Sequence, residues 1–402
     1  MEYWTREIDK GKIVGSLLID LSRAFDSIPH HLLLKELESI GMNPDSLRWF
    51  HSYLSSRQQR VVTTGYKGVW KDVSLGVPQG SCLSPILFNV YVRELPKHNP
   101  SVTHQFADDV TSSESDVSPT VVMDKLTVSL REIKQFCEAK GLAVNTNKTQ
   151  LILFKVPSRQ ILLGTELEID GITLVPEKTV KLLGVTFDTH LTFSKDIDLI
   201  VAKCHGLIGV LSKAVNYLPR ELSTRMYTAL IRSHLEYASA VRATASRTQL
   251  QCLEVVKKIC ARIIMQAPRD AHAAPLLQSL DLQCLSERRN LHIINLVKNM
   301  LTDSCHPAFQ GLFHLESSGL VSTSTSARIG IGKRQLGCFG KDMFNKHMQG
   351  VGNPSPLSLH PEILPSSTDT ASEVRSTTTA NSQVLKVSDC NYRHGCGWRD
   401  GL

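Results

Sequence analysis

Two adjacent aspartates are the residues of this chain whose types and spacing most clearly suggest chemistry. Asp108 and Asp109 follow a stretch in which Val102, His104 and Phe106 alternate with polar neighbours, a pattern that predicts a strand ending at an acidic turn. Because aspartate is common in turns, the pair alone could be a solvated Asp-Asp turn. Two adjacent carboxylates also repel each other, so a fold that holds them together is expected to bring a cation to them.

A third aspartate and a glycine-rich loop lie upstream of this pair. Residues 14–20 form an apolar run that ends in Asp20, as expected of a buried strand whose carboxylate emerges at its end. Residues 76–81 contain two glycines and one proline, which fix a backbone that a ligand can approach closely. These two features favour a shared site over a solvated turn.

The three carboxylates offer only oxygen ligands, which suit Mg²⁺ better than zinc. Two Mg²⁺ ions about 3.5–4 Å apart are the usual device for in-line phosphoryl transfer. In such a site Asp20 is expected to bridge both ions, with Asp108 as its main partner and Asp109 as the less certain ligand. The chemistry that the residue types predict is therefore attack of a hydroxyl on a phosphate.

Strands and helices that could position these residues can be predicted from periodicity. Residues 59–63 and 68–73 flank a glycine turn and predict a hairpin. Helical spacing predicts helices that begin near Pro29, Pro44, Pro85 and Ser118. In the first, Leu33, Leu34, Leu37 and Ile40 form an apolar face, and in the last the buried stripe is Val122, Leu126, Leu130, Ile133 and Cys137, followed by Gly141.

The character of the chain changes after about residue 195. Residues 196–302 are rich in helical periodicity and basic side chains, whereas the chain beyond about 314 is rich in Ser and Thr and poor in apolar periodicity. We therefore expect three regions: 1–190 with the acids, a helical region at 191–313, and a disordered tail at 314–402. Short strands are expected between residues 142 and 187.

Composition permits a polyanion partner without demonstrating one. The 402 residues carry a formal net charge of +7, and 42% of them are hydrophobic. The ten cysteines are scattered and no secretory signal precedes them, which favours reduced thiols in a nuclear or cytoplasmic protein. Cys390, His394 and Cys396 match no established zinc spacing. The apolar runs are too short to span a bilayer, so no membrane association is expected.

Three stretches resemble motifs A, B and C of a reverse transcriptase, most closely the LINE-type, jockey-like enzymes of non-LTR retrotransposons. They are residues 18–28 (LIDLSRAFDSI), 76–88 (GVPQGSCLSPILF) and 106–109 (FADD). Residues 141–149 are similar to motif D, and residues 181–187 resemble motif E, the primer grip. The resemblance covers residues 1 to about 190 well and extends more loosely to about 310.

The resemblance implies an RNA-directed DNA polymerase that adds dNTPs to a primer 3′-end on an RNA template with two Mg²⁺ ions. It also implies an α+β fold, with a palm built on a ferredoxin-like antiparallel sheet, followed by an all-α region similar to a thumb. Basic helices after residue 195 are expected to contact the duplex through its phosphates.

The resemblance assigns roles to individual residues as well. Asp20, Asp108 and Asp109 are the catalytic metal ligands, and Lys148 is the acid that protonates the leaving pyrophosphate. Phe25 is the steric gate that excludes a ribose 2′-hydroxyl; its alternative role is a core aromatic. Lys148 could equally be a solvated surface lysine.

The loop between the acids is expected to bind substrate. Pro78, Gln79 and Gly80 lie against the template base and incoming nucleotide in this interpretation, and Asp26 supports the site through hydrogen bonds.

The sequence departs from a complete polymerase at its N-terminal side. Only 19 residues precede Asp20, too few for the fingers region, and no endonuclease motif is found. We therefore expect a truncated copy, an incomplete gene, or one piece of a larger polyprotein. The alternative functions are a catalytically inactive relic that at most binds RNA or DNA, and an RNA-directed RNA polymerase, against which Phe25 argues.

Overall fold

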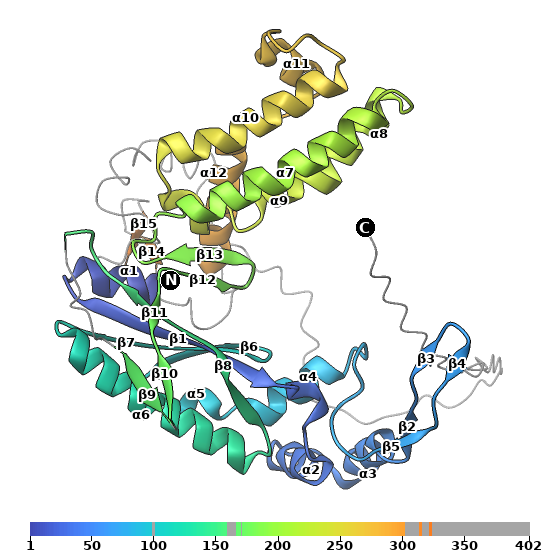
Figure 1. Cartoon of the computed structure of the whole chain (residues 1–402), viewed down its shortest axis with the longest axis vertical. Coiled ribbons are helices and arrows are strands. Elements are labelled where there is room, and N and C mark those ends of the chain that lie inside the picture. Colours follow the sequence, from blue (N-terminus) through green and yellow to red (C-terminus); the bar gives the residue numbers. More distant parts are fainter. Residues whose placement is uncertain (99–100, 159–165, 170, 302–312, 316–320, 324–402) are drawn as a thin grey trace, which may run out of the picture.

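The computed structural model describes residues 1–98, 101–158, 166–169, 171–301, 313–315 and 321–323 (Figure 1). Most of the predicted tail at 314–402, including Cys390, His394 and Cys396, lies outside these residues. Within the described part of the chain, every helix is too short or too polar to cross a lipid bilayer.

A five-stranded sheet forms the centre of the first half of the chain (Figure 1). Its strand order is β11-β8-β1-β7-β6, with β1 (Ile13–Ser22) in the middle. Strands β7 (Asp109–Asp116) and β8 (Ala143–Phe154) flank β1 on either side and are antiparallel to it. Strand β6 (Val102–Phe106) pairs antiparallel with β7, and the short edge strand β11 (Pro176–Glu177) pairs parallel with β8. The predicted mixture of helices and strands around an antiparallel sheet is confirmed, with β11 as the parallel exception.

The two faces of β1 belong to two hydrophobic cores. Ile13, Leu17, Ile19 and Leu21 enter the first core, whereas Val14 and Leu18 enter the second. Side chains alternate between the faces of a strand, so a strand covered on both faces must be apolar almost throughout. This explains why the sequence of β1 is almost continuously apolar, interrupted by Ser16 and ending near Asp20.

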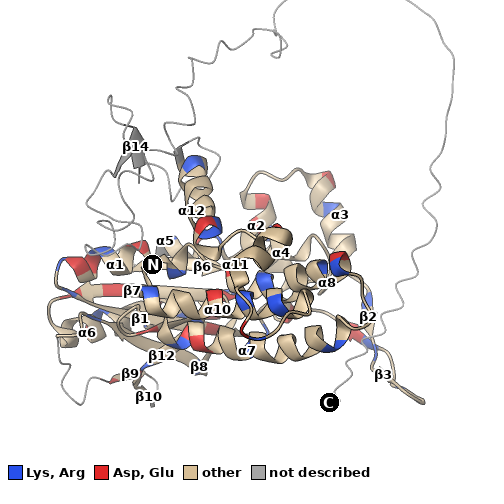
Figure 2. Cartoon of the chain, turned by 90° about the horizontal axis from the view of Figure 1, so that it is seen from above, with Lys and Arg blue, Asp and Glu red and all other residues tan. Residues whose placement is uncertain are grey.

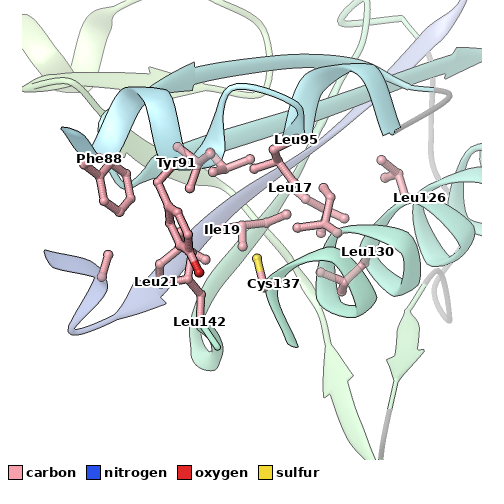
Figure 3. Close-up of a cluster of buried hydrophobic side chains, with 14 of the residues drawn as sticks. Leu17, Ile19, Leu21, Phe88, Tyr91, Leu95, Leu126, Leu130, Cys137 and Leu142 are labelled. Carbon is pink, nitrogen blue, oxygen red and sulfur yellow. The ribbon is translucent and has the colours of Figure 1, made fainter. Parts of the chain in front are cut away.

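Five helices pack into the first core: α2 (His30–Ser39), α3 (Pro44–Leu54), α4 (Ser84–Val92), α5 (Leu95–His98) and α6 (Pro119–Ala139). Figure 3 shows side chains of α6 meeting those of β1. The five predicted stripe residues of α6 are all buried, from Val122 to Cys137. In α2, Leu33 and Leu37 are buried as predicted, but Ile40 is 42% exposed because it follows the last helical residue.

Helix α1 (Glu2–Asp9) lies on the opposite face of the sheet and enters the second core. Trp4 packs against Phe154, with ring centroids 4.4 Å apart, and its indole nitrogen donates a hydrogen bond to Ser113 Oγ over 2.9 Å. Ser113 in turn shares a 2.8 Å hydrogen bond with Ser16. Two small serines at the centre of the sheet therefore accommodate the large indole ring.

The helical second half is joined to this core through the hairpin of β12 (Thr179–Leu182) and β13 (Val185–Asp188). Arg242 and Asp196 form an ion pair between buried side chains over 3.2 Å, and Asp196 also accepts a hydrogen bond from the Thr186 backbone. The helix-rich region predicted at 196–302 is confirmed. Its elements are α7 (Ser194–Ala214), α8 (Arg220–Tyr227), the π-helical turn η2 (Thr228–Arg232), α9 (Ser233–Glu236), the 3₁₀ turn η3 (Val241–Thr244), α10 (Arg247–Ile264), α11 (Ala273–Ser279) and α12 (Leu285–Leu301).

The remaining strands of the described residues form a ribbon of two strand pairs and two separate pairs. The hairpin predicted near residues 59–73 is confirmed as a ribbon of β2 (Arg57–Gln59) with β5 (Lys71–Val73) and β3 (Val62–Thr63) with β4 (Tyr66–Lys67). Strands β9 (Leu167–Ile169) and β10 (Ile172–Leu174) form one separate pair, and β14 (Phe313–Leu315) and β15 (Val321–Thr323) form the other.

Gly15 is expected to be essential for the contact between β1 and α6. A Cβ atom at this position would lie 2.5 Å from Val122 Cγ1 and 2.6 Å from Leu126 Cδ1, both in the buried stripe of α6. We predict that Gly15→Ala lowers the free energy of unfolding by about 1–3 kcal/mol through overpacking, measured by urea denaturation. Gly206→Ala is the matched control, because Gly206 lies in α7 with no atom near its Cβ position and should gain about 0.5–1 kcal/mol. Equal behaviour of the two variants would contradict this account.

Candidate active site

Strand register places Asp20 and Asp109 beside each other. Ile19 of β1 pairs with Val110 of β7 in antiparallel register, so the next step along the two strands brings Asp20 opposite Asp109. Successive side chains of a strand point to opposite faces of the sheet. Asp20 is an even number of residues from Val14 and Leu18, which face the second core, so its side chain lies on that same face. Both carboxylates stand at the end of the sheet that α1 does not cover (Figure 1).

Asp108 occupies the tight turn that connects β6 to β7. Phe106 pairs with Asp109 across this turn, and Ala107 adopts a positive φ of 51°. The Gln105 side-chain amide donates a 3.0 Å hydrogen bond to the Ala107 carbonyl. The predicted strand, acidic turn and return strand are thus confirmed.

The three carboxylates lie within electrostatic reach of one another. The pKa of Asp109 is raised above its ordinary value, first by partial burial and then by the negative charges of Asp108 and Asp20. Like charges raise a carboxyl pKa only over short distances. The raised pKa of Asp109 therefore reflects its partial burial first and, to a smaller extent, negative charge from the two neighbouring carboxylates, which a cation would relieve.

Lys148 reaches the same place from β8 through an irregularity in strand pairing. Leu18 pairs with Gln150, but Asp20, two residues further on β1, pairs with Asn145, five residues back on β8. The extra residues form a bulge, which a hydrogen bond from Thr149 Oγ1 to the Asn145 carbonyl spans over 3.0 Å. The Lys148 side chain is 71% exposed, and its Nζ lies 3.8 Å from Asp20 Oδ2.

Asp20, Asp108 and Lys148 border a polar hollow of about 390 Å³. It is lined by Asp20, Leu21, Ser22, Arg23, Asp108, Asn145 and Lys148. Sequence reasoning missed Arg23 and Asn145. The available signal for Asn145 was its position three residues before Lys148 in the motif D stretch.

The loop at residues 76–81 is hydrogen-bonded to the turn that follows β1. The Gly76 and Val77 backbone amides donate hydrogen bonds to the carbonyls of Ile28 and Phe25, each over 2.8 Å. Gly76 has a φ of +75°, and a Cβ there would lie 2.6 Å from the Asp26 Cα. Glycine is therefore required at position 76 by the approach of the protein's own backbone, whereas the sequence had suggested the approach of a ligand.

The three other predicted substrate-binding residues of this loop have different surroundings. Gln79 Nε2 donates hydrogen bonds to both carboxylate oxygens of Asp26 over 3.1 Å. Gly80 has a φ of +84° and open space at its Cβ position. The Pro78 carbonyl accepts a 2.5 Å hydrogen bond from Ser84 Oγ at the start of α4. None of the three lines the polar hollow.

Phe25 lies in the 3₁₀ turn η1 (Ala24–Asp26), between the acids and the loop. Its half-buried ring stacks on Phe88 of α4, with ring centroids 4.7 Å apart. The ring therefore has a structural contact on one side and remains partly accessible. This geometry is compatible with both roles considered for Phe25.

The donor set fits a hard divalent cation in its chemistry. Asp20, Asp108 and Asp109 supply only oxygen atoms, as Mg²⁺ prefers. As the described side chains stand, no three His, Cys, Asp or Glu groups converge closely enough to hold an ion. Lys148 instead takes the position of a counter-charge beside Asp20.

Comparison with known proteins gives the same assignment as the motifs. Residues 6–187 match the family described as "Reverse transcriptase (RNA-dependent DNA polymerase)". The chain is 26% identical to the "RNA-directed DNA polymerase from mobile element jockey" of Drosophila funebris over 65% of this chain and 29% of the relative. The corresponding jockey protein of Drosophila melanogaster is also 26% identical, over 73% of this chain and 34% of the relative.

The chain thus spans about a third of the length of these relatives. Among solved structures, apo telomerase from Candida Tropicalis matches 66% of this chain and 44% of its own, at 12% identity and a TM-score of 0.37, an overlap too loose to carry an argument. The assignment depends on the family match and on the jockey relatives. Residues 6–187 form a reverse transcriptase domain, which is similar to the polymerases of LINE-type, non-LTR retrotransposons.

Proposed function

We propose that this chain carries the nucleotidyl-transfer site of an RNA-directed DNA polymerase, which adds dNTPs to a primer 3′-end on an RNA template. The observation that carries the proposal is the register of β1 and β7, which sets Asp20 beside Asp109 on one face with Asp108 in the adjoining turn. This arrangement occurs within a domain of the reverse transcriptase family. Gathered carboxylates at the end of a rigid sheet suit phosphoryl transfer through bound metal.

Asp20 and its main partner Asp108 are the residues proposed to hold two Mg²⁺ ions, with Asp109 as the less certain ligand. When bound, the metals would activate the 3′-hydroxyl and neutralise charge on the transferring phosphate. Lys148 neutralises Asp20 in the free protein, at 3.8 Å. Because its side chain is largely exposed, Lys148 can turn from Asp20 towards the leaving pyrophosphate and donate a proton from Nζ.

Phe25 and the loop that follows β5 are the proposed determinants of nucleotide selection. Phe88 fixes the Phe25 ring from one side, so the ring can act as a barrier to a ribose 2′-hydroxyl. Asp26 holds the Gln79 amide in place, and the open space at Gly80 leaves room for a base pair against the backbone. Pro78 contributes by fixing the loop onto α4.

The remaining elements have counterparts in the polymerase interpretation. The sheet with its first-core helices corresponds to a ferredoxin-like palm, and α7 to α12 correspond to a thumb. Lys and Arg residues are distributed along α7, α8 and α10 (Figure 2), and the exposed ones, such as Lys203 and Lys213 of α7, can contact duplex phosphates. Lys257 of α10 cannot do so, because it is buried and donates a hydrogen bond to the Gln283 carbonyl. The β12–β13 hairpin corresponds to a primer grip. The Tyr237 hydroxyl donates a 2.7 Å hydrogen bond to the Leu183 carbonyl at its tip.

Substitution of Asp20 tests the proposed activity. We predict that Asp20→Asn lowers primer extension on a poly-rA/oligo-dT template by about a hundredfold or more, because impaired metal binding removes several kcal/mol of transition-state stabilisation. Asp116→Asn, at the far end of β7, is the matched control and should retain activity. If the wild-type chain is folded and binds the duplex but extends no primer, the chain is an inactive relic rather than a polymerase.

The gate assignment predicts a change in sugar selectivity. Phe25→Ala should raise the ratio of rNTP to dNTP incorporation about tenfold or more, measured in single-nucleotide extension with each substrate. The ratio is insensitive to the fraction of folded enzyme, which matters because the variant also removes the Phe88 stack. Phe88→Leu is the control: it removes the same stack but keeps the Phe25 ring, so its ratio should stay at the wild-type value. A raised ratio in both variants would assign selectivity to packing and not to the Phe25 ring.

Asp109 should make stability depend on pH and on Mg²⁺. Its pKa lies above the ordinary value of 3.8, so the folded state binds this proton more tightly than the unfolded chain does. Ionised Asp109 therefore lowers stability at neutral pH, and the penalty disappears as the pH falls below 3.8. We predict that Asp109→Asn raises the urea midpoint at pH 7 without metal, and that the gain shrinks in acid.

With Mg²⁺ present, the wild type should become more stable than Asp109→Asn, since a bound cation relieves the repulsion among the wild-type carboxylates. At ten times its Kd, a bound ion stabilises the folded state by about 1.4 kcal/mol. Asp116→Asn is the matched contrast: a hydrogen bond from Lys125 lowers the pKa of Asp116, so removal of this charge should lower stability at pH 7. The proposed carboxylate cluster would be contradicted if Mg²⁺ left the urea midpoint of the wild type unchanged and if Asp109→Asn were no more stable than the wild type without metal.

A further inference from the structure

The strands β2, β3, β4 and β5 form one extended ribbon over residues 57–73, called the β2–β5 ribbon. It carries large apolar side chains that belong to neither hydrophobic core. The exposed fractions are 77% for Val69, 68% for Val61, 63% for Tyr66 and 56% for Trp70. The ribbon extends away from the sheet at the end of the molecule formed by α2 and α3 (Figure 1). Burial normally stabilises residues of these types, so a cluster left in solvent indicates a binding surface.

The same ribbon carries cations that form no ion pair with any described carboxylate. Arg60, Lys67 and Lys71 are exposed, and within the described residues none of them is within ion-pair distance of a carboxylate. The Arg60 guanidinium lies over the Trp70 ring, 4.4 Å from its centroid. The single acid of the ribbon, Asp72, accepts a hydrogen bond from Gln58. The ribbon thus combines accessible aromatic rings with an excess of positive charge.

The ribbon is held to the rest of the protein at its base. A two-stranded ribbon is only marginally stable by itself. Arg57 donates hydrogen bonds to the Leu54 carbonyl over 3.1 Å and to the Gly76 carbonyl over 2.6 Å. Gly76 begins the loop that contains Gln79 and Gly80. The exposed surface is therefore fixed to the loop beside the candidate active site.

We propose that the β2–β5 ribbon is a binding site for single-stranded nucleic acid. Tyr66 and Trp70 would stack on unpaired bases, and Arg60, Lys67 and Lys71 would bind the phosphates between them. A single strand fits better than a duplex, because the bases of a duplex are already stacked and inaccessible to the rings. A protein partner would fit this surface less well than a nucleic acid, because Arg60, Lys67 and Lys71 form no ion pairs with the described residues and lie among the aromatic residues, where phosphates could neutralise them. The inference goes beyond the proposed polymerase activity, because binding here requires neither catalysis nor metal.

Fluorescence anisotropy with a labelled uridine 12-mer RNA tests the proposal on the full 402-residue chain, without dNTPs and without Mg²⁺. Trp70→Ala and Tyr66→Ala should each raise Kd about fivefold or more, the lower end of the contribution of one base–aromatic stack. Trp70→Phe should restore most of the affinity. Tyr217→Ala is the matched control, since Tyr217 is an 88% exposed aromatic in the helical half and should leave Kd unchanged.

Charge provides a second measurement. Lys67→Gln combined with Lys71→Gln should lower the slope of log Kd against log salt concentration by about 1.4, because each phosphate neutralised on a single strand adds about 0.7 to that slope. Unchanged Kd values in both Trp70→Ala and Tyr66→Ala would overturn the proposal. So would a wild-type dimer, in sedimentation equilibrium, that Trp70→Ala converts to monomer, because the ribbon would then be a protein interface. Failure of primer extension bears only on the proposed activity and leaves the anisotropy result standing.

Discussion

Repulsion among three carboxylates is the constraint that the rest of this structure must withstand. Two unit charges about 4 Å apart repel by about 1 kcal/mol in water and by about 4 kcal/mol near a protein surface. Burial of one Leu or Ile side chain stabilises the fold by about 1.5–3 kcal/mol. Strand β1 alone buries Ile13, Leu17, Ile19 and Leu21 in the first core. Burial on this one face of β1 is therefore enough to hold the acids together.

Two separate hydrophobic cores pack against the opposite faces of β1, the strand that carries Asp20. The first core joins β1 to α6 through close packing at Gly15. The second joins the opposite face of β1 to α1, to the β12–β13 hairpin and to α7. Asp20 lies on the face of the second core, beyond the part that is covered. The acids thus lie on a strand that packs against a core on each face, which suits the proposed transfer because that reaction requires two positioned reactants.

Much of this fold follows from periodicity in the sequence. A repeat of 3.6 residues correctly predicted the buried stripe of α6, and alternation correctly predicted β6 and the acidic turn. These are local properties, because the side chains that share a face lie within a few residues of one another. Ile40 was assigned wrongly for a local reason too: the pattern continues one residue beyond the end of α2.

The contacts that complete the site could not be predicted, because they join residues far apart in sequence. The bulge that carries Lys148 to Asp20 depends on how β8 pairs with β1, and no pattern within β8 encodes a register shift. Gln79 and Asp26 are 53 residues apart, and Gly76 is required by the Asp26 backbone. The resemblance to a polymerase family supplied the residues, but only the fold supplied their partners.

Hydrogen bonds between the loop at 76–81 and the turn after β1 would couple the proposed nucleotide selection to the acids without direct contact. Phe25 lies five residues after Asp20 in the turn that leaves β1, and its carbonyl accepts a hydrogen bond from Val77. Any shift of the loop at 76–81 must therefore move the turn that bears Phe25. The base of the β2–β5 ribbon bonds to the same loop through Arg57. A nucleic-acid strand held on the ribbon and a nucleotide held at the proposed gate would therefore be linked by hydrogen bonds that meet at Gly76 and Val77.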